Sequence, residues 1–267
     1  MLTRRPTFAD SMPALRILIA PSGFKESLGA DDVADCIEQG IARAVGDHTF
    51  VQKLPLHDGG EGFSMALTKK HGGVIVEKEV IGPVGLPVLS HYGRFGEDLK
   101  TATIDMAAAA GLRLVPRDLR VPCRTTTYGV GQLIAAALDD GCTKIIIGCG
   151  DSGTSDGGAG MLQALGVQLL DDAGVELPKA GGGYDLSFLS SMSFDFVHPR
   201  LRSDAPGMCF FHRNASRADI CQTEYPSKQF VTSRMFCVVR KASQESLVLK
   251  RGLLQKMSRF CPQDSTI

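Results

Sequence analysis

The segment GCGDSGTSDGGAGM, residues 148–161, combines six glycines with two carboxylates and three hydroxyl side chains. A strand-like run, TKIIIG at 143–148, leads into it, and a helical pattern follows. Backbone N–H groups without side chains in the way can approach phosphate oxygens closely. Asp151 and Asp156 repel a bare phosphate, so the loop suits a metal-bound nucleotide or a substrate hydroxyl that needs a base. A tight turn with close helix–strand packing explains the glycines equally well.

A second glycine loop, DGGEG at 58–62, follows another strand-like run. In an open α/β sheet, ligands bind at the carboxyl ends of the strands, where this loop is expected. Asp58 is placed to accept a hydroxyl proton, and either Asp58 or Glu61 is suited to hold Mg²⁺. The alternative is a solvated turn, since Asp and Gly are common turn residues.

Two cationic clusters accompany these loops. Lys25 follows the first strand-like run, and Arg124 precedes three threonines, 125–127, at a helix start. Each is suited to an anion, and each also fits a simpler reading as a surface lysine or a helix cap. Neither the P-loop pattern nor the dinucleotide fingerprint is present. Together the four loops hold the groups that phosphoryl transfer needs for positioning and charge neutralisation.

The elements that must position these loops alternate between strand and helix, which favours an α/β sheet. We expect strands at 15–20 and 50–56 with a helix between them, capped by Asp31 or Asp32. That helix carries one apolar stripe, which we expect to be buried, formed by Val33, Ile37, Ile41 and Val45. Further along the chain we expect helices at 64–71 and after 125, and a helix or turn from 107 to 112. We expect strands in the runs 74–82, 90–95, 101–106 and 143–148.

Composition excludes several classes of protein. The formal net charge is zero, with 43% hydrophobic and 22% charged residues, so nothing suggests a nucleic-acid or membrane-surface partner. The eight cysteines have no metal-binding spacing, and no N-terminal apolar run indicates a secretory signal. These features predict a cytoplasmic protein and leave its oligomeric state open.

The composition changes near residue 201. Glycine falls from 28 in residues 1–200 to 2 in residues 201–267, and the charge balance moves from −6 to +6. A strand at 236–239 and a short helix near 247–260 are still expected there. Such an asymmetry is also typical of a basic interaction tail.

Four long motifs resemble those of the bacterial glycerate kinases. IAPSGFKESL resembles IAPDSFKxSL, LHDGGEGF resembles ADGGEGT, and TIDMAAAAGL resembles IEMAxAxGL. The run from Thr125 to Gly166 resembles TTxGTGELIxxAL followed by IIIGxGGSATNDGGAGMxQALG. The order is the same, and the resemblance covers residues 15 to 201.

The resemblance implies ATP-dependent phosphorylation of D-glycerate to phosphoglycerate, with ATP and Mg²⁺ as cofactors. The alternative is a non-catalytic protein that binds a small hydroxy acid or a phosphorylated anion. The implied fold has two α/β domains with a cleft between them, one flavodoxin-like with parallel strands and one with a mixed sheet. We expect 15–75 to form part of the flavodoxin-like domain and 76–200 the second domain.

The resemblance also selects the candidate site. We assign Asp58 and Asp156 as proton acceptor and Mg²⁺ ligands, with Lys25 as the cation. The expected phosphate or glycerate contacts are Gly59, Gly60, Glu61, Thr126, Ser152, Thr154, Gly157 and Gly158. The family's later motifs are missing, so we expect 201–267 to be a divergent tail, translated out of frame or otherwise not the native C-terminus. The flavodoxin-like domain would then be incomplete.

Overall fold

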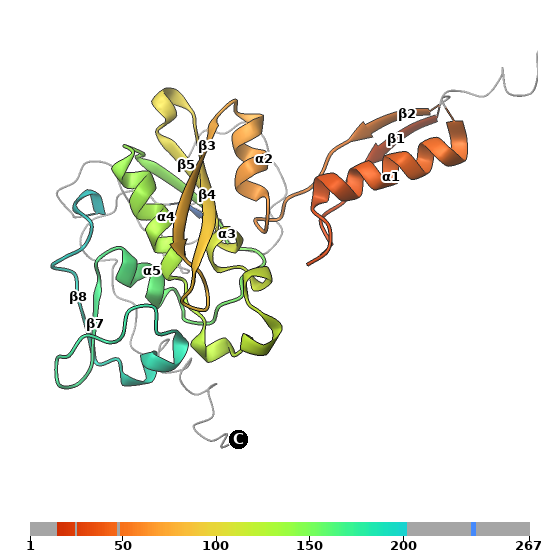
Figure 1. The fold of residues 1–267 in the computed structure, drawn as a ribbon. Coiled ribbons are helices and arrows are strands. Elements are labelled where there is room, and N and C mark those ends of the chain that lie inside the picture. Colours follow the sequence, from red (N-terminus) through yellow and green to blue (C-terminus); the bar gives the residue numbers. More distant parts are fainter. Residues whose placement is uncertain (1–14, 25, 47–48, 202–235, 239–267) are drawn as a thin grey trace, which may run out of the picture. The chain divides into compact units, whose positions relative to one another are not determined.

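The computed structural model describes residues 15–24, 26–46, 49–201 and 236–238. They belong to two compact units that divide the chain between His57 and Asp58. Both units are built of strands and helices, which confirms the α/β class (Figure 1). None of the helices in these ranges is long and apolar enough to cross a membrane. Lys25 and the expected helix near 247–260 lie outside the described residues.

The first unit is one β–α–β arrangement. It consists of β1 (Leu15–Ile19), α1 (Ala30–Val45) and β2 (Thr49–Lys53). The two strands are parallel and pair in register from Leu15 opposite Thr49 to Ile19 opposite Lys53. Parallel neighbours need a crossover, and α1 supplies it.

Two predictions for α1 are wrong. The helix begins at Ala30 after Gly29 and has no side-chain cap. Asp31 and Asp32 lie in the first turn instead, where their negative charges interact favourably with the helix dipole. The expected apolar stripe is buried only at Val33, while the side chain of Val45 is 46% exposed. Among the described residues of the first unit, this 16-residue helix has a sheet of two five-residue strands to pack against, which is too small to cover the whole stripe.

The second unit contains a mixed sheet in the order β3-β4-β5-β6-β9. Neighbours are antiparallel except for β5 and β6, which are parallel. The mixed sheet and the expected strand at 236–239 are thereby confirmed. The strands are β3 (Val74–Ile81), β4 (Pro87–Phe95), β5 (Thr101–Asp105), β6 (Lys144–Gly148) and β9 (Phe236–Val238).

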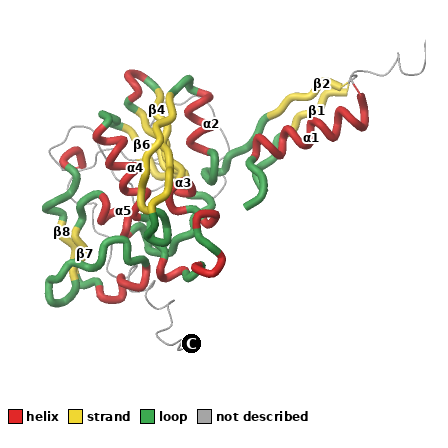
Figure 2. Tube along the Cα trace, in the orientation of Figure 1, coloured by secondary structure: helices red, strands yellow, loops and turns green. Residues whose placement is uncertain are grey.

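Helices α2 (Phe63–Lys70) and α4 (Tyr128–Asp139) cover opposite faces of this sheet (Figure 2). Gly93 of β4 leaves room for Thr68 of α2, whereas the adjacent Tyr92 is buried in the core beside α4. Consecutive side chains of a strand point to opposite faces, so one strand contacts both helices. The core on the α4 side includes Val80, Ile104, Val130, Leu133, Ile134, Ala137, Leu138 and Ile145.

Shorter elements extend the second unit. They are α3 (Met106–Ala110), α5 (Ala159–Ala164), β7 (Gln168–Leu170) and β8 (Ser191–Ser193). Helix α5 packs against α4, and β7 pairs antiparallel with β8 over a small second core. After β7 the chain folds back on itself, with a bridge between Leu170 and Glu176. Two backbone hydrogen bonds flank this bridge, from the Asp171 N–H to the Val175 carbonyl at 2.9 Å and from the Leu177 N–H to the Leu169 carbonyl at 2.7 Å.

The division between the units differs from the boundary expected near residue 75. Helix α2 precedes that position, yet it packs against β3, β4 and β5 of the second unit. The alternation of strand and helix placed α2 with α1, because periodicity does not identify which sheet a helix covers.

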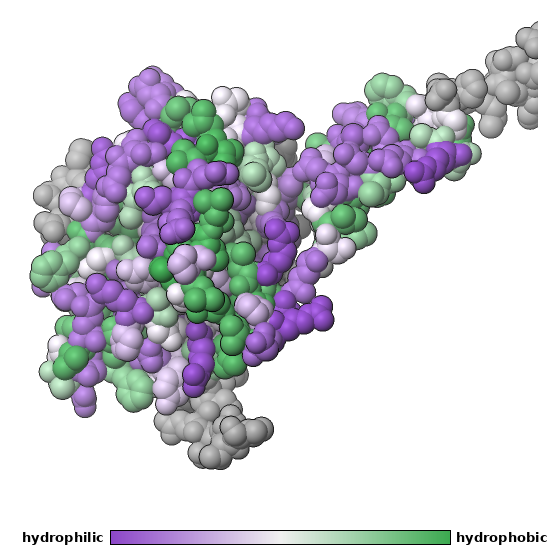
Figure 3. All heavy atoms as spheres, viewed as in Figure 1, coloured by the Kyte–Doolittle hydropathy of each residue, from purple (hydrophilic) through white to green (hydrophobic). Residues whose placement is uncertain are grey.

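The β3–β4 hairpin carries apolar side chains on its surface (Figure 3). Leu86 and Leu89 have exposed fractions of 60% and 70%, and Ile75 one of 40%. These leucines make no contribution to the core, so they offer neutral positions for control substitutions.

Candidate active site

The loops 58–62 and 148–153 pack against each other through their backbones. The Gly150 N–H donates to the Gly59 carbonyl at 2.8 Å. A Cβ atom on Gly148 would lie 2.5 Å from the Gly59 carbonyl oxygen, and one on Gly150 would lie 2.5 Å from the Gly60 nitrogen. Real Cβ contacts are not that short, so loop-to-loop packing requires these two glycines. From the sequence alone, close packing and the approach of a polyanion explained the glycines equally well.

Two carboxylates border Gly60. The Asp58 Oδ1 accepts the Gly60 N–H at 3.2 Å, and the Asp151 Oδ2 accepts the Glu61 N–H at 3.3 Å. Asp58 is exposed, and Asp151 has φ of 52°, a left-handed conformation that Asp tolerates better than most residues. Glu61 is exposed and forms an ion pair with Arg113 at 2.8 Å. The packed loops therefore present Asp58 and Asp151 next to each other.

Asp105 supports the 58–62 loop from beneath, and the sequence analysis missed it. This buried carboxylate accepts the Gly62 N–H at 3.1 Å and the Ser64 N–H at 2.6 Å, at the start of α2. Burial raises the pKa of Asp105 to about 7, against the opposing effect of the hydrogen bonds from Ser64 and Gly62. His91 Nε2 lies 4.0 Å from Asp105, and burial lowers the pKa of His91. A single Asp at the end of a strand gave no sequence signal for this role.

Asp156 is 1% exposed and accepts four hydrogen bonds. Its Oδ2 receives the Thr127 N–H at 2.7 Å, the Thr127 hydroxyl at 2.8 Å and the Gly160 N–H at 3.1 Å. Its Oδ1 receives the Gly158 N–H at 3.1 Å. The carboxylate thus joins the start of α4 to the start of α5. Thr127, expected as a helix cap, instead holds this aspartate, since no side-chain cap forms at α4.

The remaining candidates divide between surface and interior. Ser152 and Thr154 lie in the loop with their hydroxyl oxygens 3.0 Å apart, and Ser152 is exposed. Thr126 is buried, and its hydroxyl oxygen accepts the Tyr128 N–H at 3.2 Å. Gly157 and Gly158 have φ of 62° and 84°, so both take the left-handed conformation that favours glycine.

The two proposed metal ligands differ in their fit to Mg²⁺. The four donors on Asp156 use the acceptor capacity of its carboxylate, so this residue does not fit as a ligand. Asp58 is exposed and accepts one hydrogen bond, so it fits. Within the described ranges, no group of three or more His, Cys, Asp or Glu side chains is arranged to hold a metal ion.

Comparisons with known proteins bear on this site. The model of the glycerate kinase family matches residues 17–207, which include every loop described above. Glycerate kinase of Bacillus subtilis is 49% identical over 189 residues, covering 71% of this chain and 48% of that protein. Glycerate kinase of Neisseria meningitidis is 32% identical over 242 residues, covering 86% of this chain and 61% of that protein. An alignment that covers 86% of this chain needs more residues than residues 1–201 supply. It therefore extends into the segment that was expected to be divergent.

A solved structure is also similar. The crystal structure of a protein assigned as glycerate kinase 2 from Salmonella typhimurium LT2 is 47% identical, with a TM-score of 0.55. The match covers 70% of this chain and 50% of the chain in the crystal structure. The chain therefore spans about half the length of the first relatives it matches.

Proposed function

The chain belongs to the glycerate kinase family, and from that premise we propose that it takes part in ATP-dependent phosphorylation of D-glycerate to phosphoglycerate. The observation that carries the proposal is the packing of loops 58–62 and 148–153, which brings Asp58 next to Asp151 inside the family-matched region. Because the chain spans about half the length of these relatives, its own activity is part of the proposal.

We assign Asp58 as the group that accepts the proton from the attacking hydroxyl of glycerate. The Asp58 side chain is exposed, and its carboxylate accepts one hydrogen bond from within the protein, so it is free to reach a substrate. A general base must reach the substrate proton directly, which Asp156 does not while it is buried beneath the loop.

Asp156 and Asp105 are better explained as positioning residues. Asp156 fixes the end of the long loop against α4, and Asp105 fixes the end of the DGGEG loop at α2. Phosphoryl transfer depends mainly on positioning and charge stabilisation, so displacement of either loop reduces turnover.

The other proposed contacts are to phosphate or glycerate. The hydroxyls of Ser152 and Thr154 and the N–H groups of the glycine loops are donors of the kind that phosphate oxygens accept. The alternative role of Asp58 is to bind Mg²⁺ together with Asp151, and the ion would then neutralise phosphate charge there. The full proposed set is Lys25, Gly59, Gly60, Glu61, Thr126, Ser152, Thr154, Gly157 and Gly158. The cytoplasmic location and the absence of nucleic-acid and membrane partners stay predictions, and the non-catalytic alternative has no observation in its favour.

A coupled assay of ADP release tests the proposal. The purified full chain, checked for folding by circular dichroism, receives MgATP with and without D-glycerate. We expect ADP release that depends on D-glycerate. A folded protein whose ADP release is the same without D-glycerate contradicts the proposal.

A further inference from the structure

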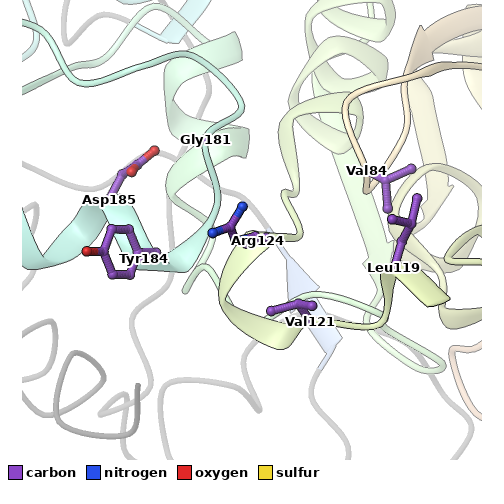
Figure 4. Close-up of a pocket in the computed structure, with 7 residues that line it drawn as sticks. All are labelled: Val84, Leu119, Val121, Arg124, Gly181, Tyr184 and Asp185. Carbon is purple, nitrogen blue, oxygen red and sulfur yellow. The ribbon is translucent and has the colours of Figure 1, made fainter. Parts of the chain in front are cut away.

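Arg124 was singled out in the sequence, and none of the roles above uses it. It lines an open pocket of about 490 Å³, within the range typical of small-molecule sites. Figure 4 shows Val84 and Leu119 on one side of Arg124, with Tyr184 and Asp185 on the other. Val121 and Gly181 complete the lining.

Three segments hold this pocket open. The Thr126 N–H donates to the Pro83 carbonyl at 2.9 Å, which fixes the β3–β4 turn beside the 122–124 turn. Gly182 packs so closely that a Cβ there would lie 2.9 Å from the Arg124 Cα. The shape of the pocket therefore rests on backbone contacts rather than on the side chains that line it.

The lining is more apolar than a small hydroxy acid requires. The side chains of Leu119, Val121 and Tyr184 are each 45–46% exposed, so the pocket offers aliphatic and aromatic surface to a ligand. Glycerate has no apolar surface large enough to gain from such contacts, whereas a purine base does. The Arg124 charge opposes the rise that burial causes in the pKa of Asp185, so the two side chains interact electrostatically in this pocket. Within the described residues the Arg124 guanidinium donates no hydrogen bond, so its N–H groups are available to a phosphate.

The pocket also adjoins the long glycine loop. A Cβ on Gly183, next to the lining residue Tyr184, would lie 2.7 Å from the Ser155 carbonyl oxygen. A ligand that extends from the pocket along this contact therefore reaches the loop that carries Ser152 and Thr154.

We propose that this pocket binds the adenosine part of the nucleotide, between the aliphatic side chains and Tyr184, with Arg124 on a phosphate. The proposal rests on the proposed kinase function and adds the place of the nucleotide. The carboxylate of Asp185 is half-buried at the same side as Tyr184 and is suited to accept hydrogen bonds from ribose hydroxyls.

Isothermal titration of the full chain with ADP, inorganic pyrophosphate and D-glycerate tests this. The variants are Leu119→Ser, which removes apolar wall, and Arg124→Ala, which removes the cation. The matched controls are Leu89→Ser, on the exposed face of β4, and Arg43→Ala, near the end of α1. All four side chains are exposed, and thermal unfolding checks that each variant folds.

We expect Leu119→Ser to weaken ADP binding about fivefold while pyrophosphate binding is unchanged. Arg124→Ala is expected to weaken the binding of ADP and of pyrophosphate about tenfold each. The control variants are expected to bind both ligands like the parent chain. If the variants bind ADP like the parent chain, the nucleotide binds elsewhere and only this inference fails. If they weaken D-glycerate binding and not ADP binding, the pocket is an acid site and the inference also fails. If the parent chain binds no ADP and shows no turnover, the proposed function fails with it.

Discussion

Replacing Asp156 by asparagine is expected to lower the free energy of unfolding, because Asp156 is a positioning residue and does not itself react. Asparagine keeps one oxygen acceptor, and its amide nitrogen must face N–H donors wherever it lies. The less costly orientation keeps the three bonds from Thr127 and Gly160 and sets the amide against the Gly158 N–H. The partly buried Gly158 N–H is then unpaired and three bonds lose their charge assistance, which costs about 2–4 kcal/mol.

Urea unfolding followed by circular dichroism measures this cost. Asp58→Asn is the matched control, because Asp58 is exposed and accepts one hydrogen bond, and its change in unfolding free energy is expected to stay below about 0.5 kcal/mol. An Asp156→Asn variant as stable as the control would refute the account of Asp156 as a buried link between α4 and α5.

Three further predictions follow from the same contacts. Asp58→Asn should reduce D-glycerate-dependent turnover at least about tenfold in the ADP-release assay, and unchanged turnover would remove it from the site. Gly150→Ala should lower the unfolding free energy by about 2 kcal/mol or more, because the new Cβ meets the Gly60 nitrogen, while the control Gly40→Ala, in open space on α1, should raise it by up to about 1 kcal/mol. The raised pKa of Asp105 means that the folded chain holds its proton more tightly than the unfolded chain, so this contribution to stability is present below about pH 4 and is lost as the pH rises through about 7. Unfolding free energies should then fall by about 2 kcal/mol between pH 5 and pH 8 in the parent chain, and equal pH slopes in the parent and Asp105→Asn would argue against it.

The sequence predicted elements and loops better than it predicted contacts. The strands β3 to β6 and the helices α2 and α4 lie close to their expected positions, because apolar runs or periods mark them and glycines such as Gly73 before β3 and Gly141 after α4 mark many of their ends. The stripe on α1 failed because periodicity says which face is apolar and not whether enough sheet exists to cover it.

The candidate site shows the same limit. Asp58 and Asp156 were assigned matching roles from similar glycine-rich surroundings, yet one is exposed and the other is buried under four donors. Partners distant in sequence, such as Thr127 for Asp156 and Gly59 for Gly150, decide these environments. Asp105 went unnoticed for the same reason, since its bonds reach 41 and 43 residues back along the chain.

Phosphorus NMR of the reaction mixture tests the central claim most directly. The folded full chain is incubated with MgATP and D-glycerate, with Asp58→Asn in parallel. The account predicts a phosphate-monoester resonance of phosphoglycerate that grows as the γ-phosphate resonance of ATP declines, and much more slowly with the variant. Loss of the γ-phosphate resonance to inorganic phosphate alone, or no loss from a folded chain, would contradict transfer to glycerate.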